Sequence, residues 1–257
     1  MPGKVWLVGA GPGDPTLITV KGLHCIRQAD VLVYDRLVCK ELLSEASAQC
    51  EMINVGKTPN FHPIPQEEIN NILIKHALQG QNVVRLKGGD PYVFGRGGEE
   101  AEALIPHQIP FEVVPGITSA IGGLAYAGIP VTHRDCASSF HVITGHRKEG
   151  KDQVDWSQYA KLDGTLVVLM GMSQLDHICQ SLILCGKEAS TPVAVVRYAS
   201  RKEQQVVCGN LDSIATLVQD AGLRSPALIV IGKVAEKHTI LEFTATHQEI
   251  QSLALTN

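Results

Sequence analysis

The feature that most constrains the fold is a regular alternation of short apolar runs with helical patterns along roughly the first 115 residues. The apolar runs, each bounded by turn residues, lie at 4–9, 31–34, 52–55, 82–86 and 111–114. Between two of them, Pro65 opens a helical pattern, and Gly80 occupies the position expected of a C-terminal capping glycine. Buried strands that alternate with helices predict parallel βαβ units in one compact α/β layer structure.

Strand-like runs continue in the second half of the chain, at 141–144, 165–170, 192–196, 205–208 and 227–231. Helical patterns fit 174–184 and 211–221. We therefore predict an α/β protein with two domains, at residues 1–116 and 117–240, followed by a tail at 241–257.

Composition and charge exclude several classes of protein. Hydrophobic residues make up 44% of the 257 residues, charged residues 19%, and the net charge is −4. This balance excludes a mainly disordered chain and a nonspecific nucleic-acid binder. The uncharged run 113–132 is long enough to cross a bilayer, but it contains two prolines and four glycines. We expect a buried segment there and no membrane partner.

Cysteine and histidine spacing predicts no metal site. The seven cysteines form no CxxC pair, and the ten histidines form no HExxH pattern. We expect reduced cysteines in a cytoplasmic protein, because the N-terminus also resembles no signal peptide.

The glycine-rich turn at 9–14 invites a dinucleotide-binding interpretation. Gly9 and Gly11 follow a strand, and Asp35 ends the next strand, as in nicotinamide-binding proteins. However, Asp14 occupies the position of the third glycine, and Pro12 removes one backbone N–H from a phosphate cradle. We expect Asp14 to cap the following helix, and we favour a turn that admits a ligand other than a phosphate.

A second turn, at 87–91, also follows a predicted strand. Gly88 and Gly89 allow close approach of a ligand to the backbone, and Asp90 can accept hydrogen bonds from hydroxyl or amino groups. Both turns end strands of the same predicted sheet, at the edge where α/β proteins bind ligands. The turn suits an adenosine or methionine moiety better than a phosphate.

Several segments in a fixed order carry a family resemblance. They are Val8-Gly-Ala-Gly-Pro-Gly-Asp14, residues 29–37, Val55-Gly-Lys57, residues 65–70, residues 83–91, Phe94-Gly-Arg-Gly-Gly-Glu-Glu100, residues 113–119, residues 128–135, Thr144-Gly-His146 and residues 225–229. From about residue 3 to residue 236, the chain resembles the uroporphyrinogen-III C-methyltransferases of the tetrapyrrole methylase family. It resembles the single-function form, which has no additional dehydrogenase/chelatase region.

The resemblance implies a fold and a reaction. The expected fold has two α/β domains with S-adenosylmethionine in the cleft between them, in a homodimer. The expected reaction methylates uroporphyrinogen III at C2 and C7, through precorrin-1, to give precorrin-2 and S-adenosylhomocysteine. Precorrin-2 feeds sirohaem and cobalamin synthesis.

The resemblance also implies roles for individual residues. The expected cofactor contacts are Pro12, Gly88, Gly89, Asp90, Val93, Thr118, Ser119, Met170 and Ala199. Ala199 stands where the family usually has glycine. The implied proton acceptor is Asp35 and the implied proton donor is Lys57.

The chemistry of methyl transfer to a pyrrole carbon needs positioning and removal of a proton. Asp35 ends a strand at the ligand edge and suits the base, although it could instead cap the next segment or pair with Arg36. Lys57 could donate a proton or hold a carboxylate. Since the substrate is a polycarboxylate, we expect Arg96 and Arg134 to bind it.

Arg96 is also an alternative to Asp35 as the residue that accepts or transfers the proton, although arginine is a poor base. Glu99, three residues further on, could orient Arg96, bond a pyrrole N–H or simply favour the helix N-terminus.

Three other functions stay open. A methylase of a later corrin intermediate is the nearest, and residues 34–36, 94–98 and 132–135 favour the early substrate instead. An NAD(P)-dependent oxidoreductase and a noncatalytic tetrapyrrole-binding protein are the others. S-adenosylhomocysteine, and not NADH, should raise the melting temperature of a methyltransferase.

Overall fold

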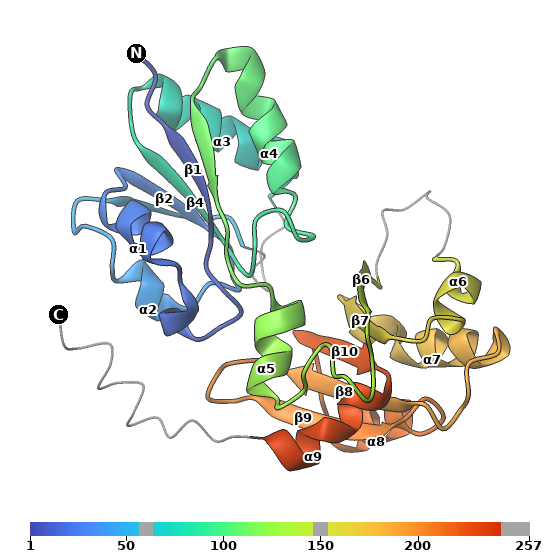
Figure 1. Cartoon of the computed structure of the whole chain (residues 1–257). Helices are drawn as coiled ribbons and strands as arrows, with labels where there is room; N and C mark the ends of the chain where they lie inside the picture. The colour runs from blue at the N-terminus through green and yellow to red at the C-terminus, as the bar shows by residue number, and fades with distance from the viewer. Residues whose placement is uncertain (57–63, 146–153, 243–257) are drawn as a thin grey trace. The chain divides into compact units, whose positions relative to one another are not determined.

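The computed structural model describes residues 1–56, 64–145 and 154–242. The chain divides into two compact units, Met1–Thr118 and Ser119–Asn257. Each unit contains one five-stranded sheet with helices beside it, as Figure 1 shows. The expected α/β fold is confirmed.

All strands of the first sheet are parallel. They are β1 (Val5–Gly9), β2 (Val31–Tyr34), β3 (Glu51–Asn54), β4 (Val83–Lys87) and β5 (Phe111–Val114), arranged in the order β3-β2-β4-β1-β5. The helices of this unit are α1 (Val20–Arg27), α2 (Lys40–Leu43), α3 (Gln66–Leu78) and α4 (Gly97–Leu104). Because the strands are parallel, their carboxyl ends meet at one edge, where the two glycine-rich turns lie.

Alternation along the central strand β4 divides its side chains between two covered faces. Val84 and Leu86 pack in the core that includes Ile26 of α1 and Leu42 of α2. Val83 packs on the opposite face, in a core with buried residues of α3 and α4. Arg85 and Lys87 follow Val83 at spacings of two residues, so they lie on that second face as well.

Helix ends follow the sequence signals. Asp14 caps the short 3-10 helix Pro15–Leu17, because its carboxylate accepts hydrogen bonds from the backbone N–H and the hydroxyl of Thr16. The predicted capping role is confirmed, although the α1 helix itself is capped by Thr19, which accepts from the Gly22 N–H. Gly80 has a φ of 83° after α3, as its capping position requires.

The second sheet is mixed. Its strands are β6 (Phe140–Thr144), β7 (Thr165–Leu169), β8 (Pro192–Arg197), β9 (Gln205–Asn210) and β10 (Ala227–Ile231), in the order β6-β7-β10-β8-β9. β6 and β7 are parallel, whereas β10 is antiparallel to both β7 and β8. β6, β7 and β8 therefore run in the same direction and end at the same edge of the sheet.

Helices cover both faces of this sheet. They are α5 (Leu124–Tyr126), α6 (Trp156–Ala160), α7 (Leu175–Leu184), α8 (Ile214–Asp220) and α9 (His238–Leu241), with a π-helix at Ser119–Gly123. The uncharged run of the sequence enters this core, since Ala120, Leu124 and Ile129 are fully buried. The expectation of a buried segment is confirmed for these residues.

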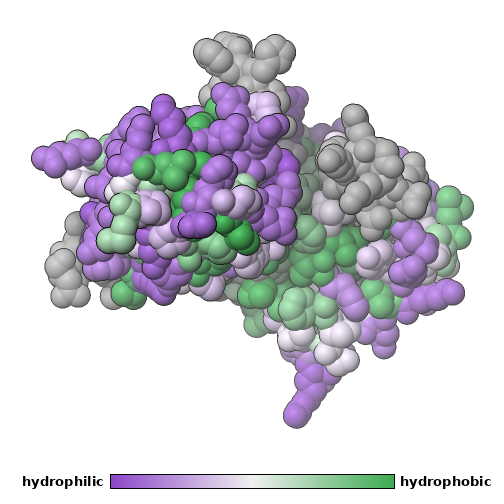
Figure 2. Space-filling view, turned by 90° about the horizontal axis from the view of Figure 1, so that it is seen from above, coloured by the Kyte–Doolittle hydropathy of each residue, from purple (hydrophilic) through white to green (hydrophobic). Residues whose placement is uncertain are grey.

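The visible face in Figure 2 mixes hydrophilic side chains with smaller hydrophobic patches. Among the exposed apolar side chains is the consecutive run Tyr92, Val93 and Phe94, which follows the second glycine-rich turn. Within the described residues, no helix combines the length and the apolar character needed to cross a bilayer.

Candidate active site

Three loops at the carboxyl edge of the first sheet approach one another through glycines. Gly11 and Gly89 exchange backbone hydrogen bonds of 3.2 and 2.8 Å, so the turns after β1 and β4 are joined directly. A Cβ on Gly9 would lie 2.6 Å from the Gly116 Cα, and a Cβ on Gly116 would collide with the Gly89 carbonyl oxygen. We call Gly9, Gly11, Gly89 and Gly116 the glycine interlock. Any side chain at Gly9 or Gly116 would push these loops apart.

The Asp90 side chain links the turn after β4 to the loop after β5. One carboxylate oxygen accepts from the Gly116 N–H at 3.0 Å, and the other accepts from the Tyr92 N–H at 2.8 Å. Asp90 therefore fixes the shape of the turn, and its oxygens are already engaged by the backbone.

The backbone of the first turn is poorly suited to a pyrophosphate. The N–H of Ala10 donates to the Lys87 carbonyl at 2.7 Å, and the N–H of Gly11 donates to Gly89. Pro12 has no N–H to offer. The donors that a dinucleotide phosphate would need at these three positions are thus absent or occupied, which argues against the nicotinamide interpretation.

Asp35 follows β2 at the same edge and is paired with a buried arginine. Arg85 Nη2 donates to Asp35 Oδ1 at 2.6 Å. The Arg85 side chain is 3% exposed and that of Asp35 is 30% exposed. The ion-pair partner of Asp35 is therefore Arg85 of the neighbouring strand rather than the adjacent Arg36.

Glu100 of α4 connects the same arginine to a lysine. Glu100 Oε1 accepts from Arg85 Nε at 3.0 Å, from Lys87 Nζ at 2.8 Å and from Gln66 Nε2 at 3.1 Å. Glu100 is completely buried, and Lys87 is 3% exposed. We call Asp35, Arg85, Lys87 and Glu100 the buried charge network.

Burial and pairing shift the pKa values in this network in opposite directions. Desolvation lowers the pKa of the Lys87 ammonium, and the nearby Arg85 guanidinium lowers it further. For Arg85, desolvation alone would lower the pKa, but the Asp35 and Glu100 carboxylates together raise it above its ordinary value. Arg85 thus stays a cation beside Asp35.

Arg96 precedes α4 with a left-handed φ of 60°. Its guanidinium forms a two-pronged pair with Glu99, with Nε to Oε1 at 2.9 Å and Nη2 to Oε2 at 2.7 Å. Both side chains are 54% exposed. Through this contact Glu99 can orient Arg96, which is one of the roles expected of it. The hydrogen bonds that Arg96 donates to Glu99 also raise the pKa of the Arg96 guanidinium, which favours a charge-binding role over that of a base.

In the second unit, strained backbone gathers where β7 and β8 end. Met170 after β7, and Tyr198 and Ser200 after β8, have φ angles of 57°, 49° and 62°. Left-handed non-glycine residues are uncommon and cluster at functional sites. The Met170 side chain is 53% exposed, whereas Ala199 is buried.

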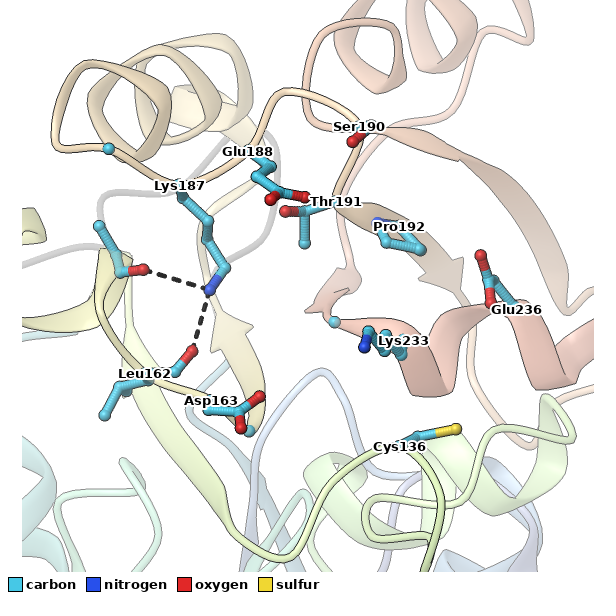
Figure 3. Close-up of a pocket in the computed structure, with 14 residues that line it drawn as sticks. Cys136, Leu162, Asp163, Lys187, Glu188, Ser190, Thr191, Pro192, Lys233 and Glu236 are labelled. Atoms are coloured by element: carbon cyan, nitrogen blue, oxygen red, sulfur yellow. Dashed lines mark hydrogen bonds between the residues drawn. The ribbon is translucent and has the colours of Figure 1, made fainter.

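A pocket of about 500 Å³ lies at the opposite edge of the second sheet, where β7 and β8 begin (Figure 3). Lys187 points its ammonium at the carbonyls of Leu162 and Ala160, at 3.1 and 3.4 Å. The lining of the pocket mixes acidic and basic side chains, with Asp163 near Lys187 and Glu236 near Lys233. This pocket contains none of the predicted site residues, so it is not the candidate site.

Comparison with known proteins gives the family. Residues 4–215 match the family described as tetrapyrrole (corrin/porphyrin) methylases. A uroporphyrinogen-III C-methyltransferase of Priestia megaterium is 52% identical to the chain over 233 residues, covering 90% of the chain and 98% of that relative. The chain belongs to the tetrapyrrole methylase family. The resemblance carried by the sequence motifs is confirmed.

Two further proteins extend the comparison. A siroheme synthase of Chromobacterium violaceum is 49% identical over 91% of the chain, which matches 50% of that longer relative. The crystal structure of a uroporphyrin-III C-methyltransferase of Thermus thermophilus, complexed with S-adenyl homocysteine, superimposes with a TM-score of 0.78. Its sequence is 41% identical, and the match covers 91% of the chain and 99% of that structure.

The structure brings some of the family-implied residues together within the first unit. Gly88, Gly89 and Asp90 lie in the turn that the interlock joins to the turn containing Pro12. Thr118 is close to the same place, since a Cβ on Gly89 would lie 3.8 Å from its Cα. Val93 is exposed on the loop that follows.

Other implied residues lie in the second unit or outside the described residues. Ser119 begins the π-helix, and Arg134 is exposed in the turn closed by the backbone bridge between His133 and Ala137. Lys57, the implied proton donor, lies outside the described residues. No group of His, Cys, Asp and Glu that could hold a metal occurs among the described residues.

The sequence interpretation missed Arg85, Lys87 and Glu100. A signal for the first two was present, because basic residues two apart on a buried strand share a face and need a buried acid as partner. Nothing local identifies Glu100 as that acid. It is one of two adjacent glutamates in the first turn of α4, and helix packing alone decides that Glu100 points inward and Glu99 outward.

Proposed function

We propose that the chain is an S-adenosylmethionine-dependent C-methyltransferase that methylates uroporphyrinogen III at C2 and C7, through precorrin-1, to give precorrin-2. The observation that carries this proposal is the 52% identity to a uroporphyrinogen-III C-methyltransferase over nearly the whole of both chains. The glycine interlock supports it, because the backbone N–H groups that a dinucleotide phosphate would need at Ala10 and Gly11 are already occupied.

The residues present fit the cofactor. A Cβ on Gly89 would meet only the Cα of Thr118, at 3.8 Å, so the turn leaves room beside Gly89, and Asp90 fixes the shape of the turn. We assign cofactor binding to Pro12, Gly88, Gly89, Asp90, Val93, Thr118, Ser119, Met170 and Ala199. S-adenosylmethionine supplies a methyl group on a sulfonium, which needs no further activation by the protein.

The chain's own residues then position the ring and remove a proton. Methylation of a pyrrole carbon leaves positive charge on the ring, and the charge is discharged when a proton leaves. We assign the acceptor to Asp35, whose carboxylate is partly exposed at the ligand edge and held by Arg85. Lys57 is the proposed proton donor.

The polycarboxylate substrate needs cations that grip carboxylates. Arg96 presents an exposed guanidinium that Glu99 orients in a fixed direction, and Arg134 is exposed in its turn. We assign both to the substrate carboxylates, with Glu99 holding Arg96 or bonding a pyrrole N–H. A role of Arg96 in proton handling is disfavoured by the raised pKa of its guanidinium.

We also infer a cytoplasmic homodimer whose product enters sirohaem or cobalamin synthesis. The sirohaem branch is supported by the match to a siroheme synthase. Light scattering after size-exclusion chromatography measures the oligomeric state directly, and a mass of 27.7 kDa in solution would exclude the dimer.

The deciding experiment is an anaerobic incubation with uroporphyrinogen III and methyl-labelled S-adenosylmethionine, followed by mass analysis of the tetrapyrrole. Two added methyl groups are expected. If no methyl group is added although calorimetry shows that S-adenosylhomocysteine binds, the assigned substrate is contradicted and the search moves to later corrin intermediates.

Asp35→Ala should lower turnover by about 10²-fold or more, as expected for loss of a general base. Arg96→Ala should raise the KM for the tetrapyrrole.

A further inference from the structure

The buried charge network continues the apolar face of β4. Val83, Arg85 and Lys87 alternate with the residues of the other face, and all three are buried. Two desolvated cations in the centre of a sheet are unfavourable unless well paired, and a hydrophobic replacement is often at least as stable. Stability alone therefore gives no reason for this arrangement.

Glu100 determines which way the Arg85 guanidinium faces. Its Oε1 binds Arg85 Nε at 3.0 Å, and Lys87 and Gln66 bind the same oxygen. With Nε fixed toward α4, Nη1 reaches the Leu86 carbonyl at 3.3 Å and Nη2 reaches Asp35 at 2.6 Å. The planar fork transmits the orientation set by Glu100 to Asp35.

The network leads outward to a single partly exposed group. The side chains of Arg85, Lys87 and Glu100 are 3%, 4% and 0% exposed, whereas that of Asp35 is 30% exposed. Asp35 is thus the member that a bound substrate can reach. Arg85 engages its Oδ1, so Oδ2 is the oxygen that can face the ring.

We propose that Arg85, held by Glu100, is the positioning residue that orients the Asp35 carboxylate toward the substrate proton. The inference rests on the proposed function, in which Asp35 accepts that proton. A base must lie within hydrogen-bond reach in the right direction, and a displacement of about 1 Å can cost a factor of about 10² in rate. An aspartate at a strand end, without such a fork, would be free to rotate.

The substitution Arg85→Lys separates charge from geometry. Lysine keeps the positive charge but is a point donor on a flexible stem, so it cannot bridge Asp35 and Glu100 in the same way. We expect kcat to fall by about 10- to 100-fold. The KM for S-adenosylmethionine and the Kd for S-adenosylhomocysteine should stay within about twofold, because the glycine interlock does not use Arg85.

A matched control is available in the same unit. Arg27 also binds a glutamate through Nε and Nη2, at 3.0 and 2.8 Å from Glu45 Oε2, but on the exposed surface. Arg27→Lys changes the same kind of fork and should leave kcat unchanged.

A double-mutant cycle distinguishes positioning from a merely structural role. In an Asp35→Asn background, Arg85→Lys should reduce the single-turnover methylation rate by less than about twofold further, because the group it positions is gone. An undiminished loss in that background would overturn the proposal. So would a wild-type kcat for Arg85→Lys or for Asp35→Asn.

If Arg85→Lys does not fold, Glu100→Gln tests the same chain of contacts. Glutamine retains the size and the acceptor oxygen of Glu100 but loses its charge. We expect kcat to fall at least about fivefold with unchanged affinity for S-adenosylhomocysteine, and a normal kcat would overturn the inference. A wild-type chain that binds S-adenosylhomocysteine but methylates no uroporphyrinogen III would overturn the proposed function first. If the wild type methylates uroporphyrinogen III but Arg85→Lys costs as much in the Asp35→Asn background as in the wild type, only the positioning role of Arg85 would be overturned.

Discussion

The two units treat buried charge differently. Among the described residues, the buried acidic, basic and histidine side chains all belong to the first unit, and they are Asp14, His76, Arg85, Lys87 and Glu100. The buried polar side chains of the second unit are Thr165 and Ser200. Desolvated charge is costly, and it persists where it is paired or performs chemistry. The first unit is therefore the place to look for proton transfer.

The two sheets also differ in strand direction. The parallel first sheet brings the carboxyl ends of five strands to one edge, and with them the glycine interlock and Asp35. In the mixed second sheet only β6, β7 and β8 end at one edge, and Met170, Tyr198 and Ser200 follow β7 and β8 there with left-handed backbone. Left-handed non-glycine residues occur in both units, so buried charge, and not backbone strain, is what distinguishes the first unit.

The largest effect is expected from a methyl group in the glycine interlock. Gly116→Ala places a Cβ against the carbonyl oxygen of Gly89, and backbone cannot move aside as a flexible side chain can. We expect the affinity for S-adenosylhomocysteine, measured by calorimetry, to fall at least about tenfold. Gly98→Ala is the control, since a Cβ there meets nothing within 4 Å. Equal affinities for the two variants would remove the interlock from cofactor binding.

The next effect concerns the stability of the first unit. Glu100→Leu leaves Arg85 and Lys87 buried with Asp35 as their remaining acidic partner in the network, and we expect a loss of about 3–5 kcal/mol. The chain has two tryptophans, Trp6 in the first unit and Trp156 in the second. Urea unfolding of single-tryptophan variants therefore reports each unit separately.

Thr165→Val is the counterpart in the second unit. The Thr165 hydroxyl is buried and has no hydrogen-bond partner among the described residues. Replacing it with a methyl group should leave the stability reported by Trp156 unchanged or raise it by about 1 kcal/mol. A loss as large as that of Glu100→Leu would erase the contrast between the units.

An intermediate effect is expected at the contact between Gly123 and Ala199 in the second unit. A Cβ on Gly123 would lie 2.7 Å from the Cβ of Ala199, so the methyl group of Ala199 already occupies the space. Gly123→Ala should destabilise the second unit by about 1–3 kcal/mol through overpacking. Adding Ala199→Gly should restore most of that loss. No restoration would mean that another contact causes the destabilisation.

The smallest effect concerns pH at the surface of the first unit. Hydrogen bonds from Lys21 and Lys4 lower the pKa of Glu112 from 4.5 to about 2. Because the folded pKa is the lower one, the pair stabilises the fold above pH 4.5, and this contribution is lost as the pH falls toward 2. The urea midpoint of Glu112→Gln should lie slightly below that of the wild type at pH 7 and approach it as the pH falls below 2. High salt should shrink the difference at pH 7.

The sequence predicted the elements of both units better than the contacts of the site. The strands and the main helices lie within a few residues of their predicted positions, and Asp14 caps as expected. These features depend on local patterns of apolar residues, glycine and capping groups. The partner of Asp35 could not be predicted in the same way, because Arg85 is 50 residues away.

The sequence by itself therefore determined the family, the alternation of strands and helices and the glycines that open the ligand edge, because these are written in short, ordered motifs. Only the tertiary structure decided that β10 runs antiparallel between β7 and β8, and that Glu100 rather than Glu99 enters the core. Strand order and helix rotation depend on packing between segments far apart in the chain. The same packing turns two basic residues of one strand into a network that ends at Asp35.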